Sequence, residues 1–231
     1  MFKKFLFLAF IVSSCASSAQ ERKDSRDLGR WMVENEDPDT RVVVHSDTIE
    51  AWTPKGLTIW YKQKIQAPCQ IDYDAMVVSD GGQYDRLSDL NCFWMARDTL
   101  IDDGSVLARR SERRGVFVRQ YVLQLYYLGF GGNGNKTTRF RRYDADEMAV
   151  SDPHCRPSII KEYTDPDHLL RPNHWYHVHI ECHSDGSTTY SIDGETLVSY
   201  SDPSPLLWGW FGFRTTKSHT LLANFAVSDG L

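Results

Sequence analysis

Four histidines fall within ten residues of the chain, at positions 174, 177, 179 and 183. Side chains alternate along a strand, so His177, His179 and Glu181 share the face opposite Val178 and Ile180. An H-x-H pair of this kind suits a general base and its neighbour, or two zinc ligands. We therefore predict catalytic roles for His177 and His179. Ordinary surface histidines remain an alternative, and no metal or other cofactor is assigned because further ligands could only be guessed.

A second candidate group lies between Thr137 and Tyr143. In an extended strand Arg139, Arg141 and Tyr143 project from one face, spaced about 6.6 to 7 Å apart, while Phe140 points inward. Guanidinium groups neutralise carboxylates, and a phenol can donate a proton to a leaving oxygen. We predict catalytic roles for Arg141 and Tyr143 and substrate binding by Arg139.

Glycines precede this strand as a literal G-x-G-x-x-G at Gly129, Gly131 and Gly134. A dinucleotide site needs a helix directly after the glycines. The residues that follow have neither helical periodicity nor strong helix formers, so the motif predicts a hairpin loop. Asn133 and Asn135 in this loop are added as substrate-binding candidates.

Charge is unevenly distributed along the chain. The net formal charge is −5, yet residues 109–142 hold nine basic side chains and a single acid, Glu112. Such a basic segment in an acidic protein favours one anionic ligand, with a solvated charged face as the alternative. Further binding candidates come from the alternation of neighbouring predicted strands: Asn91, Gln124, Tyr126, Trp210 and Arg214.

Short runs of β-branched and aromatic residues between turn signals predict the elements that position these side chains. The predicted strands cover 41–45, 57–65, 73–78, 90–97, 119–128, 137–143, 175–182, 188–192, 195–199, 210–215 and 221–227. So many strands with little helical pattern predict an all-β, two-sheet sandwich of the jelly-roll type.

The first residues have the pattern of an export signal. A cationic start, an apolar run and small residues predict cleavage after Ala19, with a lipoprotein-type cleavage before Cys15 as the alternative. Residues 20–231 then form one domain, periplasmic, extracellular or lipid-anchored, with no membrane span. The remaining cysteines, Cys69, Cys92, Cys155 and Cys182, are expected to pair as structural disulfides in an oxidising compartment, in an unknown connectivity.

The C-terminal third resembles the concanavalin A-like lectin and glucanase superfamily. The resemblance rests on the W-x-x-V-x-I strand at Trp175–Ile180, the Y-x-I-D-G turn at Tyr190–Gly194 and the G-F-R strand at Gly212–Arg214. Residues 85–95 are similar to a strand of small secreted bacterial sandwich proteins from polysaccharide-degrading systems. The resemblance implies a jelly-roll fold and a carbohydrate ligand, and leaves the activity open because one fold serves many functions.

Three functions fit these observations. The basic segment favours a polysaccharide lyase that cleaves a uronate-containing glycan by β-elimination, since such a site must neutralise a carboxylate beside the proton it removes. A glycoside hydrolase with paired carboxylates and a non-catalytic carbohydrate-binding module are the alternatives. The expected partner is an anionic polysaccharide or oligosaccharide, whereas export and the acidic remainder of the chain argue against nucleic acid.

Overall fold

The computed structural model describes residues 27–230, and the predicted export signal lies outside them. The strands are β1 (Asp27–Leu28), β2 (Trp31–Asn35), β3 (Arg41–His45), β4 (Thr48–Tyr61), β5 (Ile65–Gln66), β6 (Cys69–Val78), β7 (Leu90–Arg97), β8 (Gln124–Gly131), β9 (Thr137–Asp144), β10 (Lys161–Tyr163), β11 (Tyr176–Cys182), β12 (Ser187–Ile192), β13 (Glu195–Ser201) and β14 (Trp208–Asp229). Short helices are α1 (Arg110–Arg113), α2 (Gly132–Asn135), α3 (Met148–Ser151), η1 (Phe117–Val122), η2 (Pro153–Cys155) and η3 (Pro166–His168).

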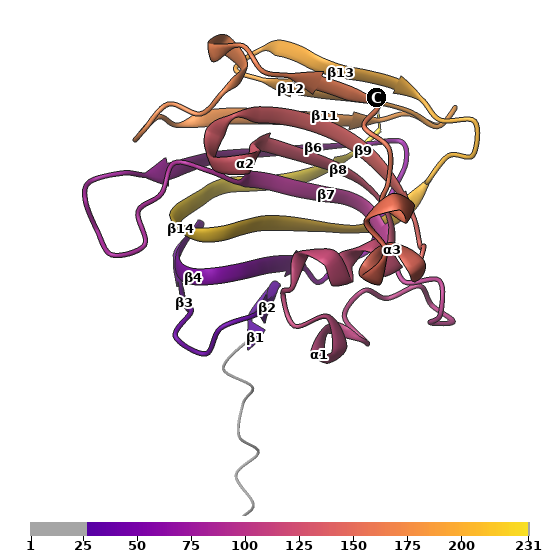
Figure 1. Cartoon of the computed structure of the whole chain (residues 1–231). Coiled ribbons are helices and arrows are strands. Elements are labelled where there is room, and N and C mark those ends of the chain that lie inside the picture. The colour runs from indigo at the N-terminus through magenta and orange to yellow at the C-terminus, as the bar shows by residue number, and fades with distance from the viewer. Residues whose placement is uncertain (1–26, 231) are drawn as a thin grey trace, which may run out of the picture.

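The antiparallel strands form two layers that share their longest members (Figure 1). The front layer has the order β10-β9-β8-β7-β14-β4-β2, and the back layer has the order β13-β12-β11-β6-β14-β4-β3. The sequence therefore predicted the sandwich correctly. Among the described residues, no helix has the length and apolar character needed to cross a membrane.

Strand β14 passes from one layer into the other. Its first half pairs with β7 and its second half with β6, and its register with β4 shifts between Thr216 and Ser218. Lys217 has a φ of 39°, which fits an extra residue that bends the strand. The two strands predicted at 210–215 and 221–227 are consequently one bent strand, because the turn-like residues between them form a bulge.

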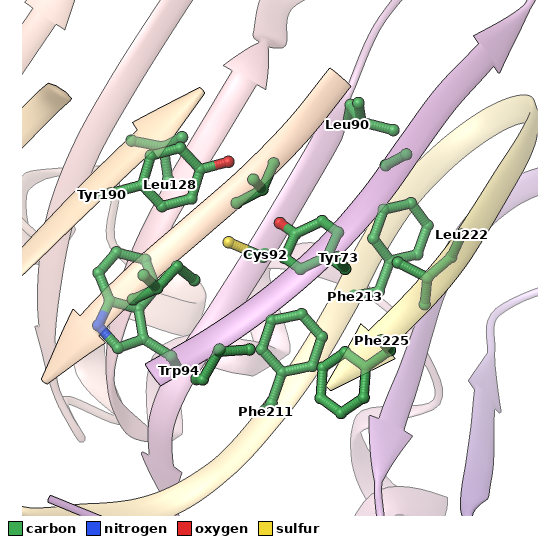
Figure 2. Packing of buried hydrophobic residues seen from close by; sticks show 14 of the residues in the cluster. Tyr73, Leu90, Cys92, Trp94, Leu128, Tyr190, Phe211, Phe213, Leu222 and Phe225 are labelled. Carbon is green, nitrogen blue, oxygen red and sulfur yellow. The ribbon is translucent and has the colours of Figure 1, made fainter. Parts of the chain in front are cut away.

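Apolar side chains from the facing surfaces of both layers fill the space between them. Figure 2 shows Trp94 and Phe211 from the front layer packed near Tyr73 and Tyr190 of the back layer, with Cys92 among them. The rings of Trp94 and Tyr190 stack with centroids 5.8 Å apart. Burying each large side chain contributes about 1.5–3 kcal/mol, so this cluster is the main source of stability.

The outer face of the front layer carries a second apolar cluster, which includes Trp60, Phe93 and Tyr143. Residues 98–123, which we call the covering segment, lie over it. This segment contains η1 where a strand was predicted at 119–128, so the strand begins only at Gln124. The prediction was wrong because Tyr121 and Leu123 of this segment pack into the second apolar cluster, and their spacing imitates strand alternation.

A buried ionic network holds the covering segment in place. Glu34 of β2 is 2% exposed and accepts hydrogen bonds from Trp60 Nε1 (2.9 Å), Gln120 Nε2 (2.7 Å) and the Gly115 amide (3.0 Å). It also pairs with the buried Arg113 guanidinium at 3.0 Å. Each oxygen of the Glu34 carboxylate thus binds groups from the covering segment.

Internal ion pairs neutralise part of the basic run. Arg113 pairs with Glu34 and Asp98, Arg142 with Asp144 and Asp202, and Arg139 with Glu162. The charge pattern therefore overstated the field available to a ligand, because the acidic partners lie outside residues 109–142.

The four cysteines of the described residues are free thiols, contrary to the disulfide expectation. Cys69 and Cys182 face each other across β6 and β11. Cys92 lies in the core, where burial raises the pKa of its thiol to about 12.

Candidate functional site

A pocket of about 330 Å³ opens beside the covering segment on the outer face of the front layer. We call it the arginine pocket. Its walls combine four arginines and two carboxylates with aromatic rings and two amides: Glu36, Arg86, Asp89, Asn91, Phe117, Tyr121, Tyr127, Gly129, Gly132, Asn133, Thr137, Arg139, Arg141, Arg214 and Thr216. This volume is at the lower end of the range for small-ligand sites. The structure thus brings together Asn91, Asn133, Arg139, Arg141 and Arg214, while their roles stay predictions.

Two of these arginines lack a counter-ion. Within the described residues, neither Arg141 nor Arg214 has a carboxylate at ion-pair distance; Arg141 donates to the Pro157 carbonyl, and Arg214 donates to Thr58 Oγ1 (3.1 Å) and the Gly115 carbonyl (2.9 Å). Arg214 is 2% exposed, and burial lowers the pKa of its guanidinium. A buried cation such as Arg214 calls for an anion.

Arg139 and Arg86 differ from this pair because each already holds a carboxylate. Arg139 Nε lies 2.5 Å from Glu162 of β10, and Arg86 lies 2.5 Å from Asp89. Both ion pairs are partly exposed, so they contribute little to stability and can exchange partners. Positive potential in the pocket therefore comes mainly from Arg141 and Arg214.

The side of the pocket formed by β7 and β8 presents unpaired polar atoms. Asn91 is 3% exposed, and its Oδ1 is buried without a hydrogen-bond partner among the described residues. The Tyr127 hydroxyl also has no partner among residues 27–230, and burial raises its pKa. A carbonyl oxygen and a phenol are thus free to bind hydroxyl groups of a ligand.

The glycine motif shapes this pocket. A Cβ at Gly129 would lie 2.2 Å from the Tyr127 hydroxyl, so the missing side chain leaves room for the phenol. Gly131 (φ 66°) and Gly134 (φ 69°) adopt left-handed conformations in the turn between β8 and β9. The predicted hairpin is confirmed, and its glycines serve the packing of Tyr127 and the turn.

The two loop asparagines diverge. Asn133 lines the pocket and donates to Thr137 Oγ1 at 3.3 Å. Asn135 instead turns toward residue 170, where its amide donates to the Leu170 carbonyl (2.9 Å) and accepts from the Leu170 amide (2.8 Å). Asn135 therefore fixes the loop outside the pocket.

Other predicted site residues also lie elsewhere. Tyr126 points between the layers and donates to Asp202 (2.7 Å), and Gln124 accepts from Arg97 Nε (2.7 Å). Their placement on the pocket face was wrong. Trp210 packs beneath the covered surface, and its Nε1 donates to the Lys62 carbonyl at 3.2 Å.

Tyr143 shares the face of Arg141, as predicted, but is fully buried below the pocket. Burial raises the pKa of its hydroxyl well above the usual value, and the hydroxyl has no hydrogen-bond partner among the described residues. Its ring lies 5.0 Å from Tyr121 and 5.6 Å from Tyr127 between centroids. Tyr143 therefore supports the aromatic wall of the pocket from behind.

The predicted histidines lie on the outer face of the back layer. His177 Nδ1 is 2.8 Å from Asp74, and His179 Nδ1 is 2.6 Å from Asp72, across β11 and β6. Burial alone would lower the pKa of His179, but hydrogen bonds to Asp72 and Glu181 raise it. The histidines and the arginine pocket thus occupy different layers, so the four predicted catalytic residues are not assembled in one site. No group of three or more metal-ligating side chains occurs within residues 27–230.

Sequence reasoning missed Tyr127 and Tyr121. The sequence pattern of β8 predicted that Leu125 faces the core and that Tyr126, its neighbour, faces outward. Both faces of β8 are in fact apolar, because the covering segment supplies a second core. Gly129, two residues after Tyr127 on the same face, was the available signal for a crowded polar side chain there.

The chain belongs to the family described as "Domain of unknown function (DUF6250)", whose model matches residues 51–225. No curated protein sequence is similar to it. A protein of unknown function with a galectin-like fold from Bacillus subtilis has a TM-score of 0.63 at 16% identity, over 86% of this chain and 89% of that one. The carbohydrate-binding module CBM66 from Bacillus subtilis has a TM-score of 0.56 at 13% identity, over 87% and 96%.

The exoplasmic/lumenal domain of VIP36, solved with Ca²⁺ and mannose, has a TM-score of 0.57 at 11% identity, over 88% of this chain and 84% of that one. These likenesses show a galectin-like or concanavalin-like β-sandwich. They confirm the resemblance to the concanavalin A-like superfamily for the fold, while the likeness to polysaccharide lyases stays a prediction.

Proposed function

We propose that this DUF6250 domain is an exported carbohydrate-binding protein whose arginine pocket takes an acidic saccharide. The carrying observation is the pair Arg141 and Arg214, two guanidinium groups that form no ion pair within the described residues, at one pocket with the unpaired Oδ1 of Asn91. A uronate can satisfy both kinds of group, because its carboxylate can accept hydrogen bonds from a guanidinium and its hydroxyls can donate to an amide oxygen.

Neighbouring groups support this ligand class. The rings of Phe117 and Tyr121 form an aromatic wall with centroids 5.6 Å apart, suited to the apolar face of a sugar ring. Structures of similar fold are described as a carbohydrate-binding module and as a mannose-bound domain, which favours saccharides over other carboxylates.

Calorimetric titration tests the proposal. Oligosaccharides that contain galacturonate or glucuronate should bind, and the matching neutral sugars should bind at least tenfold more weakly. Arg141→Ala should weaken uronate binding roughly 10- to 100-fold, as expected for a lost charge-assisted hydrogen bond. Arg119→Ala removes an exposed positive charge from the covering segment outside the pocket and should leave affinity unchanged. Equal affinity for acidic and neutral sugars would refute the proposal.

β-Elimination in the same pocket is a second candidate, favoured by the unpaired Tyr127 hydroxyl beside the arginines. With the uronate carboxylate neutralised, the Glu36 carboxylate in the pocket wall would take the proton from C5, and the C4–C5 double bond would form as the bond from C4 to the glycosidic oxygen breaks. The neutral Tyr127 phenol would donate its proton to the departing oxygen. The products would include an unsaturated uronate with ultraviolet absorbance. Lack of absorbance together with binding would leave a binding protein, and new reducing ends without absorbance would indicate hydrolysis.

A further inference from the structure

A second cavity of about 580 Å³ adjoins the arginine pocket. We call it the outer pocket. Both cavities draw their walls from the same three stretches, 36–39, 82–89 and 214–219. Asp85 lines the outer pocket, and Arg86, the next residue of the same loop, lines the arginine pocket. The loop from β6 to β7, which projects at the left of Figure 1, contributes to both cavities.

The outer pocket has the opposite electrostatic character. Its carboxylates are Asp39, Asp80 and Asp85, and its permanent cation is Arg41. Asp85 accepts hydrogen bonds from two loop amides and lies 3.5 Å from His219 Nδ1, and these contacts hold the pKa of its carboxyl below the usual value against the effect of burial. Asp85 is therefore ionised at neutral pH, and a second uronate would be repelled here.

Aromatic side chains line the same cavity. Trp52 is sandwiched: its ring stacks on His219 with centroids 4.8 Å apart, and Arg41 lies 4.9 Å from the ring centroid. Tyr84 is half-buried and has neither a ring contact nor a hydrogen bond within residues 27–230. A free tyrosine ring beside carboxylate acceptors suits a neutral sugar, whose C–H face packs on the ring and whose hydroxyls donate to the carboxylates.

We infer that the outer pocket is a subsite for a neutral sugar next to the acidic sugar in the arginine pocket, an inference that rests on the proposed function. The preferred ligand is then a heteropolymer in which uronates neighbour uncharged units, in contrast to a homopolymer of uronates. The positive arginine pocket would select the uronate, and the negative outer pocket would exclude a second uronate, so the two cavities together would favour an alternating polymer.

Calorimetry with two tetrasaccharides of equal length tests this inference. Chondroitin tetrasaccharide alternates glucuronate with N-acetylgalactosamine, and tetragalacturonate carries only uronates. The first should bind at least tenfold more tightly. Tyr84→Ala should weaken its binding about tenfold and leave the affinity for free glucuronate unchanged, whereas Tyr84→Phe, which keeps the ring, should preserve most of the affinity. Trp175→Ala, at an exposed tryptophan outside both cavities, is the matched control.

The outcomes separate the two proposals. Tighter binding of tetragalacturonate, or an unchanged affinity of Tyr84→Ala for chondroitin tetrasaccharide alongside normal glucuronate binding, would overturn the outer subsite and leave the arginine pocket standing. Failure of every uronate to bind the wild-type protein would overturn both. Circular dichroism of each variant confirms that loss of binding does not reflect loss of the fold.

Discussion

The outer faces of the two layers differ in whether their charged and titratable side chains have partners. On the front layer Arg141 and Arg214 line a pocket beneath the edge of the covering segment, and neither forms an ion pair with the pocket carboxylates Glu36 and Asp89. On the back layer His177 and His179 stand uncovered, and each pairs with an aspartate of the neighbouring strand. Cross-strand pairing neutralises charge and keeps a strand face solvated. We therefore propose the ligand site where two arginines form no ion pair within the described residues, and assign no ligand to the paired histidines.

The largest expected effect is a loss of stability when the covering segment, which lies only over the front layer, loses its buried ion pair. Arg113→Met should destabilise the fold by about 3–5 kcal/mol, because Glu34 would remain buried without its cation and Asp98 would keep only Arg109. Urea unfolding measures the change. Arg119→Ala, at an exposed arginine of the same segment, should stay within about 0.5 kcal/mol. A small effect of Arg113→Met would mean that the covering segment is a mobile lid, and the contrast between a covered and an open face would fail.

A smaller effect is expected at the strand β8 wall of the pocket. Gly129→Ala should cost about 1–3 kcal/mol, because the new Cβ meets the Tyr127 hydroxyl at 2.2 Å and the ring must move. It should also weaken uronate binding, since Tyr127 lines the pocket. Gly132→Ala is the matched control, where the nearest atom lies at 3.5 Å. Equal stability and equal affinity for the two variants would show that Gly129 does not shape the pocket.

The sequence predicted the sandwich because strand alternation and turn residues are local signals. It also placed Arg139, Arg141 and Asn91 on one face correctly. It failed for Tyr126 because a second core makes both faces of β8 apolar, and periodicity cannot choose between two buried faces. It failed to separate His179 from Arg141 because two strands of equal pattern can lie in different layers. Which of the arginines have carboxylate partners depends on contacts between distant segments, such as Arg113 with Glu34.

The pairing of histidines also predicts a modest dependence of stability on pH. His168 lies 2.6 Å from Asp165 and 3.1 Å from Glu195; burial alone would lower its pKa, but these bonds raise the pKa above 6.5. Its stabilising contribution is therefore complete below pH 6.5 and is lost as pH rises through the raised pKa. The melting-temperature difference between wild type and His168→Gln should shrink from pH 6 to pH 8. A difference that grows with pH would contradict the assignment of a charged imidazole.

The smallest effect is expected on the exposed histidine face. His177 is 56% exposed on its side chain, so replacing it by Gln removes a surface hydrogen bond with Asp74 and should cost less than about 1 kcal/mol. Uronate binding should not change, because the arginine pocket lies on the other layer. Calorimetry of His177→Gln beside Arg141→Ala tests both statements in one series. Loss of uronate binding in His177→Gln would place the ligand on the back layer and reverse the roles of the two faces.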